Sequence, residues 1–321
     1  MVATSIQRAC FATLITAESL LPGLAVFSHS LLRSDYASAY PLVVMVTPKL
    51  SQRGRTAIEQ MGCIIRDVSP IYAPPTHNGE SVLAYAHFSE VWTKLRAFDL
   101  TEYDKVVLVD SDMLVRRNMD ELFDLPETFW EAKKIAATFA CTCNPRKMGT
   151  YPANWIPENC GFRLQTRNTL NVTNNTTRLG TSAPETHNLL NSGLVVLTPD
   201  AQVMEMIVHK ISTDAGVNDY RFPDQDFLAD LHKGRWHILP WTYNALKPLR
   251  YCQSEMWVDE EVKNVHYIID KPWLSGPPPP SSADFVTHSW WWEAYRSLQA
   301  STRSNLLMEL WTELIEKNVS E

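Results

Sequence analysis

Two aspartates, Asp110 and Asp112, stand one residue apart directly after an apolar run over residues 105–109 (KVVLV). A continuous apolar run of this length is typical of a strand that is buried on both faces of a sheet. In open α/β sheets ligands bind outside the carboxyl ends of the strands. Two carboxylates there could bind one hard divalent cation, with oxygens of two phosphates as its other ligands. A solvated turn is the alternative, since short motifs of this kind often occur without a ligand.

The elements that would position this pair alternate along the chain. Apolar strands are predicted over residues 11–16, 42–47, 63–68, 105–109, 193–197, 236–239 and 265–269. Helical patterns are predicted over residues 20–33, 51–61, 86–98 and 200–213, and another begins near residue 223. Strands that alternate with helices are the signature of βαβ units. The sequence therefore predicts an α/β fold with a mostly parallel central sheet flanked by helices.

Composition and charge exclude several classes of protein. The chain has 321 residues, of which 45% are hydrophobic, so it can bury a full core and is neither disordered nor fibrous. Its net charge of −7 offers no basic surface for nucleic acid. No stretch approaches the roughly 18 consecutive apolar residues that a membrane span requires. A cytoplasmic protein without a transmembrane segment is expected, and the glycosylation sequons at Asn171, Asn174, Asn175 and Asn318 keep the lumen of the secretory pathway as the alternative.

Two segments interrupt the regular pattern. Residues 141–187 are rich in Pro, Asn and Thr and show little periodicity, which predicts a long surface excursion. Residues 277–280 are four prolines, which predict a stiff spacer before an aromatic-rich helical tail. The expected division is a main domain over residues 1–275 and a spacer with a tail over residues 276–321 that packs on the core. Within the tail, the tryptophans at 290–292 could stack on sugar rings or dock the tail on the core.

The six cysteines are too few and too scattered for a disulfide scaffold, so reduced thiols are the default. Cys141, Cys143 and Cys160 lie in the irregular segment. They lack a Cys-x-x-Cys pair and an evident fourth ligand, which favours free or structural thiols over a zinc site. The chain also lacks a GxGxxG or GxxxxGK[ST] loop, so a Rossmann dehydrogenase or a P-loop enzyme has no support from motifs.

Several blocks, taken in order, resemble glycosyltransferase family 8, with its glycogenin-like and galactinol-synthase-like branches nearest. The aspartate pair lies within YDKVVLVDSDMLVRRNMDELFDLP at 103–126, and TKL precedes it at 93–95. The later blocks are NSGLVVLTP at 191–199, PDQDF at 223–227, LPWTYNAL at 239–246 and HYIIDKPW at 266–273. The resemblance runs from about residue 11 to residue 273.

This resemblance implies a GT-A fold and a retaining transferase that uses a UDP-sugar and Mn²⁺, with Mg²⁺ as the alternative. It implies that the metal ligands are Asp110, Asp112 and His266. Residues on the reactive face of the donor would be Asp224, Gln225 and Lys94. The donor would be bound by Thr13, Thr16, Lys94, Asp110, Ser111, Asn191, Ser192 and Lys271. The metal would neutralise the diphosphate as UDP departs.

Each of these residues also has a structural interpretation. A histidine before an apolar run, such as His266, is often a packed or hydrogen-bonded side chain, and Lys94 can be a surface lysine. Asp224 could instead interact favourably with the dipole of a helix that begins at Pro223. Gly193 would allow a ligand to approach the backbone closely. The chain departs from the family where Leu20 replaces an aromatic residue, Tyr85 replaces an arginine and Ile268 and Ile269 replace a glycine.

Three functions are consistent with this pattern. The first is transfer of a hexose from a UDP-hexose to a sugar, polyol, lipid or protein acceptor that the sequence does not identify. The second is binding of a nucleotide sugar or carbohydrate with weak or no transfer, and the third is a DxD-type phosphatase, whose aspartate pair normally follows the first strand. Tyr251 lies, by counting, where glycogenin carries its self-glucosylated tyrosine, but its flanks differ and packing is favoured. A homodimer is compatible with all three functions.

Overall fold

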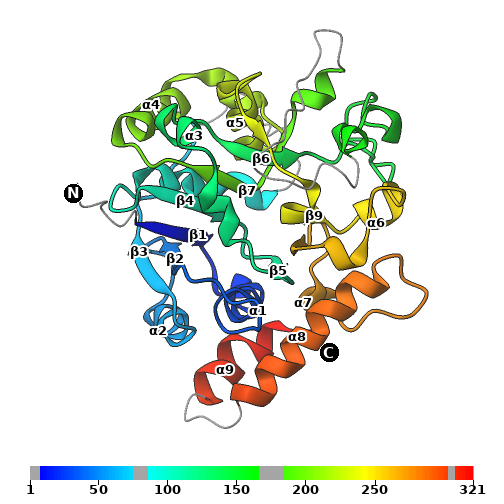
Figure 1. Cartoon of the computed structure of the whole chain (residues 1–321). Coiled ribbons are helices and arrows are strands. Elements are labelled where there is room, and N and C mark those ends of the chain that lie inside the picture. The colour runs from blue at the N-terminus through cyan, green and yellow to red at the C-terminus, as the bar shows by residue number, and fades with distance from the viewer. Residues whose placement is uncertain (1–7, 75–85, 166–183, 303–307, 321) are drawn as a thin grey trace, which may run out of the picture.

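The computed structural model describes residues 8–74, 86–165, 184–302 and 308–320, and a seven-stranded sheet forms its centre (Figure 1). The order of the strands is β3-β2-β1-β4-β7-β6-β8. All neighbours pair in parallel except β7, which is antiparallel to both β4 and β6. The expectation of a mostly parallel sheet is therefore confirmed. The strands are β1 (Ala9–Ile15), β2 (Leu42–Val46), β3 (Ile64–Asp67), β4 (Lys105–Val109), β6 (Ala136–Phe139), β7 (Leu190–Leu197) and β8 (His237–Ile238).

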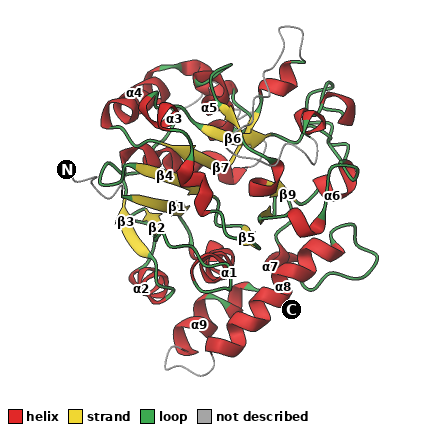
Figure 2. Cartoon of the chain, viewed as in Figure 1, coloured by secondary structure: helices red, strands yellow, loops and turns green. Residues whose placement is uncertain are grey.

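Helices lie on both sides of the sheet (Figure 2). They are α1 (Leu21–Leu32), α2 (Gln52–Gln60), α3 (Glu127–Glu131), α4 (Ala201–Thr213), α5 (Pro223–Leu231), α6 (Leu249–Cys252), α7 (Pro272–Ser275), α8 (Phe285–Thr302) and α9 (Met308–Leu314). The Ser51 side chain accepts the amide hydrogen of Gly54 and so caps α2, and Asp200 caps α4 in the same manner. Both capping residues stand at the first positions of the helical patterns predicted over residues 51–61 and 200–213.

A second, three-stranded sheet lies beside the main one and brings distant segments together. Its order is β5 (Met113–Val115), β10 (Asn264–His266) and β9 (Ala245–Leu246). β10 pairs antiparallel with β5 in a register that sets His266 opposite Met113. The chain turns from β4 to β5 through residues 110–112, so this register brings His266 to the aspartate pair.

The C-terminal helices pack on the first part of the chain, α8 against α1 and α9 against α2. Trp291 is fully buried, stacks on Tyr295 with ring centroids 5.2 Å apart, and packs beside Trp273. Trp292 is also buried. These two tryptophans therefore hold the tail on the core, and stacking of a sugar on them is ruled out by their burial.

Several predicted elements differ from the observed ones. The predicted helix at 86–98 is a run of 3₁₀ turns over Ala86–Asp99, and the predicted strand at 265–269 ends at His266. The predicted strand at 193–197 begins earlier, at Leu190, so that Asn191 and Ser192 lie inside β7. At these three places, contacts with other segments determine where the regular structure begins and ends. A local sequence pattern contains no information about such contacts. Tyr85 and the sequons at Asn171, Asn174 and Asn175 lie outside the described residues.

In the part of the chain that the structure describes, no helix is long and apolar enough to cross a membrane.

Candidate active site

A cavity of about 380 Å³ opens where the predicted site residues converge. It is lined by Thr16, Lys94, Asp110, Ser111, Asp112, Asn191, Ser192, Asp224, Gln225, His266 and Lys271, among others. The family resemblance predicts that Thr13 binds the donor, but Thr13 does not line the cavity and is fully buried in β1. Successive strand side chains point to opposite faces, so Leu14 and Thr16 reach the cavity and Thr13 faces away.

The aspartate pair and His266 are close enough to share one metal ion. One ligand atom from each of the three residues lies within 4.8 Å of the other two. The Nε2 atom of His266 is 3.6 Å from an oxygen of Asp110 and 3.3 Å from an oxygen of Asp112. Two carboxylates and one imidazole fit a divalent ion such as Mn²⁺, with further positions free for phosphate oxygens.

The other ring nitrogen of His266 is held by an amide network. Its Nδ1 lies 2.9 Å from Asn244 Oδ1. The amide nitrogen of Asn244 donates to Thr138 and Asn191, so its oxygen faces the imidazole and Nδ1 must carry the proton. In the neutral imidazole, Nε2 therefore presents its lone pair to the aspartates. An imidazole oriented in this way by an outer hydrogen bond is the arrangement typical of metal-ligating histidines.

Gly193 makes this arrangement possible. A Cβ atom at position 193 would lie 2.3 Å from Cε1 and 2.5 Å from Nδ1 of His266. The sequence predicts that this glycine lets a ligand approach the backbone, but the group that approaches it is the imidazole ring. The absence of a side chain at residue 193 thus sets the position of His266.

We expect Gly193→Ala to displace His266, because no real Cβ atom tolerates a contact of 2.3 Å. Overpacking of this kind costs about 1–3 kcal/mol of unfolding free energy. Displacement of the imidazole is expected to weaken Mn²⁺ binding about 10- to 100-fold. Thermal unfolding and a calorimetric Mn²⁺ titration measure the two effects. Gly149→Ala is the matched control, because a Cβ there meets nothing within 4 Å, and equal behaviour of both variants would contradict the prediction.

Two lysines neutralise the carboxylates of the site. Lys94 is buried, and its Nζ lies 2.6 Å from Asp110 Oδ1 and 3.3 Å from Asp224 Oδ2. Burial alone would lower the pKa of Lys94, but the two carboxylates outweigh it and raise that pKa, so Lys94 stays charged. Lys271 pairs with Asp112 and also donates to the carbonyl oxygen of Tyr267 at 2.9 Å.

The two metal-site carboxylates differ electrostatically. Burial raises the pKa of Asp110, although the charge of Lys94 opposes this shift. Burial also acts to raise the pKa of Asp112, but Lys271 and His266 outweigh it and hold that pKa well below its ordinary value. Asp112 is therefore the member of the pair that stays ionised most firmly, through its partnership with Lys271.

Asp224 and Gln225 lie at the start of α5 and are both buried at the cavity. The Oδ2 atom of Asp224 is buried and accepts no hydrogen bond within the described residues, although Lys94 lies 3.3 Å away. Gln225 accepts a hydrogen bond from Asn191 at 3.0 Å, and Asn191 is bonded through its oxygen to Asn244 and to the amide of Gly193. Asn191 thus links the candidate metal ligand His266, through Asn244, to α5.

Two parts of the site, Asn244 and an aromatic wall, are not predicted from the sequence. Asn244, which orients His266, lies within the block LPWTYNAL, but nothing in that block points to its role. An aromatic wall also lines the cavity, formed by Tyr151, Trp155 and Phe222, in which Trp155 and Phe222 stack with an interplanar angle of 7°. Two of these residues belong to the irregular segment, and no periodic signal could have identified them.

The departures from the family pattern have structural counterparts. Leu20 lines the cavity, where the family carries an aromatic residue. Ile269 stands where the family pattern predicts a glycine, and it adopts a φ of 70°, the left-handed conformation that glycine favours. The loop after His266 therefore keeps a glycine-like course despite its isoleucines. Tyr251 is 42% exposed and does not line the cavity, so its position gives no support to self-glycosylation.

Comparisons with known proteins agree on one family. Residues 12–276 match the model of glycosyl transferase family 8. Galactinol synthase 5 of Arabidopsis thaliana is 28% identical over 241 residues, and the alignment covers 74% of this chain and 65% of that protein. Galactinol synthase 1 of Solanum lycopersicum is 26% identical over 84% of this chain and 76% of that protein. The chain thus spans just under two thirds of the length of several such relatives.

Solved structures show the same fold. The structure of the galactosyltransferase LgtC with donor and acceptor sugar analogues superposes with a TM-score of 0.55 at 17% identity. That superposition covers 89% of this chain and 95% of LgtC. The bifunctional glycosyltransferase WbbM also gives a TM-score of 0.55, at 20% identity, over 92% of this chain and 52% of WbbM. The expected GT-A fold is confirmed.

Proposed function

The chain belongs to glycosyl transferase family 8, and we propose that it is a retaining, metal-dependent transferase that moves a hexose from a UDP-sugar to a hydroxyl acceptor. The observation that carries the proposal is the convergence of Asp110, Asp112 and His266 on one wall of the cavity. Asp224 faces the same cavity, beyond Lys94. In this proposal these four residues and Lys94 provide a metal site and a reactive site within the same cavity.

In this proposal Asp110, Asp112 and His266 hold Mn²⁺, or Mg²⁺ as the alternative. The bound metal neutralises the diphosphate and stabilises the charge on the departing UDP. Lys271 now pairs with Asp112, and on donor binding it exchanges this partner for a phosphate oxygen. Thr16, Ser111 and Ser192 also line the cavity and would contact the donor.

Catalysis at the sugar would depend on the charged groups at α5. Asp224 presents a buried oxygen that lies 3.3 Å from Lys94 Nζ and accepts no hydrogen bond from the described part of the chain, and this oxygen would stabilise positive charge at C1. The C1–O bond to the phosphate breaks while a C1–O bond to the acceptor forms on the same face. The departing phosphate oxygen takes the acceptor proton. Gln225 and Asn191, joined by a hydrogen bond, would bind hydroxyl groups of the hexose.

The substrates are proposed from the surroundings of the cavity and from the relatives. The galactinol synthases and the galactosyltransferase LgtC carry galactose in their names, so UDP-galactose is the first donor to test. The aromatic wall of Tyr151, Trp155 and Phe222 offers faces on which the ring of a sugar or cyclic polyol acceptor can pack. A carbohydrate-like acceptor is therefore favoured over a lipid or a protein.

We also propose that residues 1–275 form the transferase domain, with residues 276–321 as a spacer and docked tail. Packing of α8 on α1 and burial of Trp291 support this division.

The proposal is tested by incubating the protein with Mn²⁺ and a panel of UDP-sugars, with and without candidate acceptors, and measuring released UDP and transferred sugar. We expect EDTA to inactivate the enzyme and Mn²⁺ to restore it. His266→Ala is expected to raise the Mn²⁺ concentration for half-maximal activity at least about tenfold. His209→Ala, on the exposed side of α4, is the control. Full activity in EDTA would overturn the metal assignment, and UDP-sugar binding without transfer would favour the alternative of a binding protein.

A further inference from the structure

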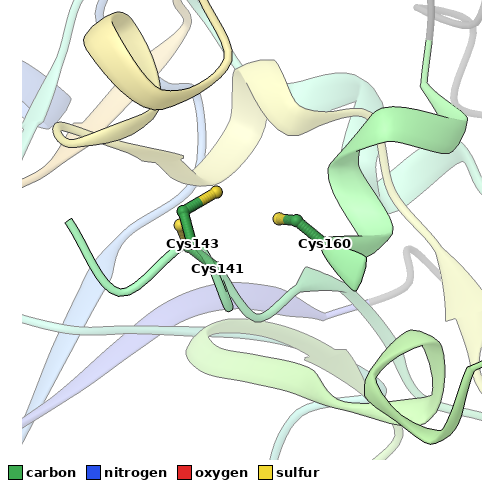
Figure 3. A group of neighbouring side chains, drawn as sticks. All are labelled: Cys141, Cys143 and Cys160. Atoms are coloured by element: carbon green, nitrogen blue, oxygen red, sulfur yellow. The ribbon is translucent and has the colours of Figure 1, made fainter. Parts of the chain in front are cut away.

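Three cysteines that the proposed reaction does not use converge beside the cavity. Cys141 and Cys143 follow β6, and Cys160 lies between two 3₁₀ turns of the irregular segment. Their sulfur atoms all lie within 4.8 Å of one another. Figure 3 shows Cys160 pointing toward the loop that carries the other two. Cys143 and Cys160 are buried, whereas Cys141 lines the cavity wall.

A fourth cysteine approaches the same group. Cys252 is the last residue of α6, and the side-chain amide of the next residue, Gln253, donates to Cys143 Sγ at 3.2 Å, which brings Cys252 beside the group. The Cys143 thiol lowers the pKa of the Cys252 thiol. The four thiols therefore come from three segments that are distant in the sequence. The spacing of the cysteines along the chain gives no sign of a fourth ligand, because α6 brings Cys252 to the group only in the folded structure.

Hydrogen-bond donors surround these sulfurs in the way that metal-bound thiolates require. The side-chain amide of Gln253 donates to Cys143 Sγ at 3.2 Å, and the backbone of Thr142 acts to lower the pKa of the Cys160 thiol, against the burial that raises it. Such N–H···S bonds stabilise negative charge on the sulfur and orient it. Tetrahedral Zn²⁺ with Zn–S bonds of about 2.3 Å needs sulfur atoms about 3.8 Å apart, which agrees with the crowding of the three mutually close thiols.

We propose that a structural zinc ion is bound by four thiolates, those of Cys141, Cys143, Cys160 and Cys252. Four protein ligands close the coordination sphere, so this ion fastens segments together and takes no part in the reaction. It joins the loop after β6, the two 3₁₀ turns on either side of Cys160, and α6. Cys141 and Asn144 line the cavity, so the zinc ion fixes the wall that lies next to Tyr151 and Trp155. The site is separate from the proposed Mn²⁺ ligands.

The rival arrangement is a pair of disulfides among the same four residues. The full chain, purified without reductant, distinguishes the two by metal analysis and by titration of thiols in denaturant with chelator. Zinc binding predicts one zinc per chain and six titratable thiols, one for each cysteine. Two disulfides would leave two thiols, those of Cys10 and Cys63, and no zinc. The second result, or iron in place of zinc, overturns the proposal.

Variants then test the ligand set. Cys143→Ser and Cys252→Ser are expected to lose the zinc, whereas Cys63→Ala, outside the group, is expected to keep it. His187 is a rival ligand, because Cys160 acts to raise the pKa of His187 and its buried Nδ1 has no hydrogen-bond partner in the described chain. Loss of zinc in His187→Ala with retention in Cys252→Ser would overturn the assignment of the fourth ligand.

If a variant does not fold, the absorption spectrum of the Co²⁺-substituted wild-type protein tests the proposal instead. Four thiolates predict strong sulfur-to-cobalt charge transfer and tetrahedral d–d bands, and a spectrum without them contradicts the proposal. Asp112→Asn is expected to retain a full zinc ion, since its carboxylate belongs to the other site. Zinc content therefore reports on this inference independently of whether the protein transfers sugar.

Discussion

Asp110→Asn and Asp112→Asn are each expected to reduce sugar transfer by about 10²- to 10³-fold, the loss typical when a group that stabilises transition-state charge is removed. Each substitution removes a charged oxygen ligand without changing the size of the side chain. It also leaves a lysine, Lys94 or Lys271, without its principal carboxylate partner. Metal-dependent UDP binding is expected to be lost in parallel, because the phosphates and the aspartates share the metal.

The fold should survive both substitutions. The backbone of the turn is held independently, by the amide of Asp110 on the carbonyl of Gly193 and the amide of Tyr267 on the carbonyl of Asp112. Circular dichroism and thermal unfolding check this point. Asp104→Asn, at the opposite end of β4 and remote from the cavity, is the matched control. Activity above a few per cent in both site variants at saturating Mn²⁺ would contradict the metal assignment.

Local sequence predicts those parts of the fold whose conformation depends on residues within a single segment. β4 is apolar from Val106 to Val109 because both of its faces are covered, and all five of its residues are buried. The apolar run alone therefore places the aspartates that follow it at a strand end. The caps of α2 and α4 are predictable for the same reason, since a cap depends on residues within one turn.

The parts that could not be predicted depend on pairing between distant segments. His266 reaches the aspartates because β10 pairs with β5, a three-residue strand with no periodic signal of its own. Asn244 acquires its role only when that pairing sets it beside the imidazole. Without the family resemblance, His266 would be one of several histidines with no distinguishing signal.

The tryptophans show how one residue type supports opposite interpretations. The cluster at 290–292 is the conspicuous aromatic signal in the sequence. Trp291 and Trp292 of this cluster are nevertheless buried, because they lie on the side of α8 that packs on the core. By contrast, the aromatic wall of the cavity is formed by Tyr151, Trp155 and Phe222, which lie outside any regular sequence pattern. Aromatic packing and sugar binding require the same side chains, so only the location of the cavity separates the two uses.

Asp224→Asn is expected to reduce turnover by about 10²- to 10³-fold with little change in UDP affinity. Retention at C1 requires either a covalent glycosyl-enzyme or attack by the acceptor on the face from which UDP departs. Asp224 is buried at the start of α5 and lies 3.3 Å from the charged Lys94. A carboxylate fixed in this way is suited to stabilising an oxocarbenium-like charge electrostatically, and asparagine removes that charge while keeping the shape.

This variant separates the reactive site from the metal site, because Asp224 contacts Lys94 rather than the three proposed ligands. Calorimetric titration with UDP and Mn²⁺ should therefore give nearly the same dissociation constant for variant and wild type, while single-turnover transfer slows. Asp230→Asn, exposed on the same helix, is the control. The wild-type product should be α-linked by NMR when the donor is an α-linked UDP-sugar. A β-linked product would overturn the retaining assignment, and an unimpaired Asp224→Asn enzyme would remove that carboxylate from the reaction.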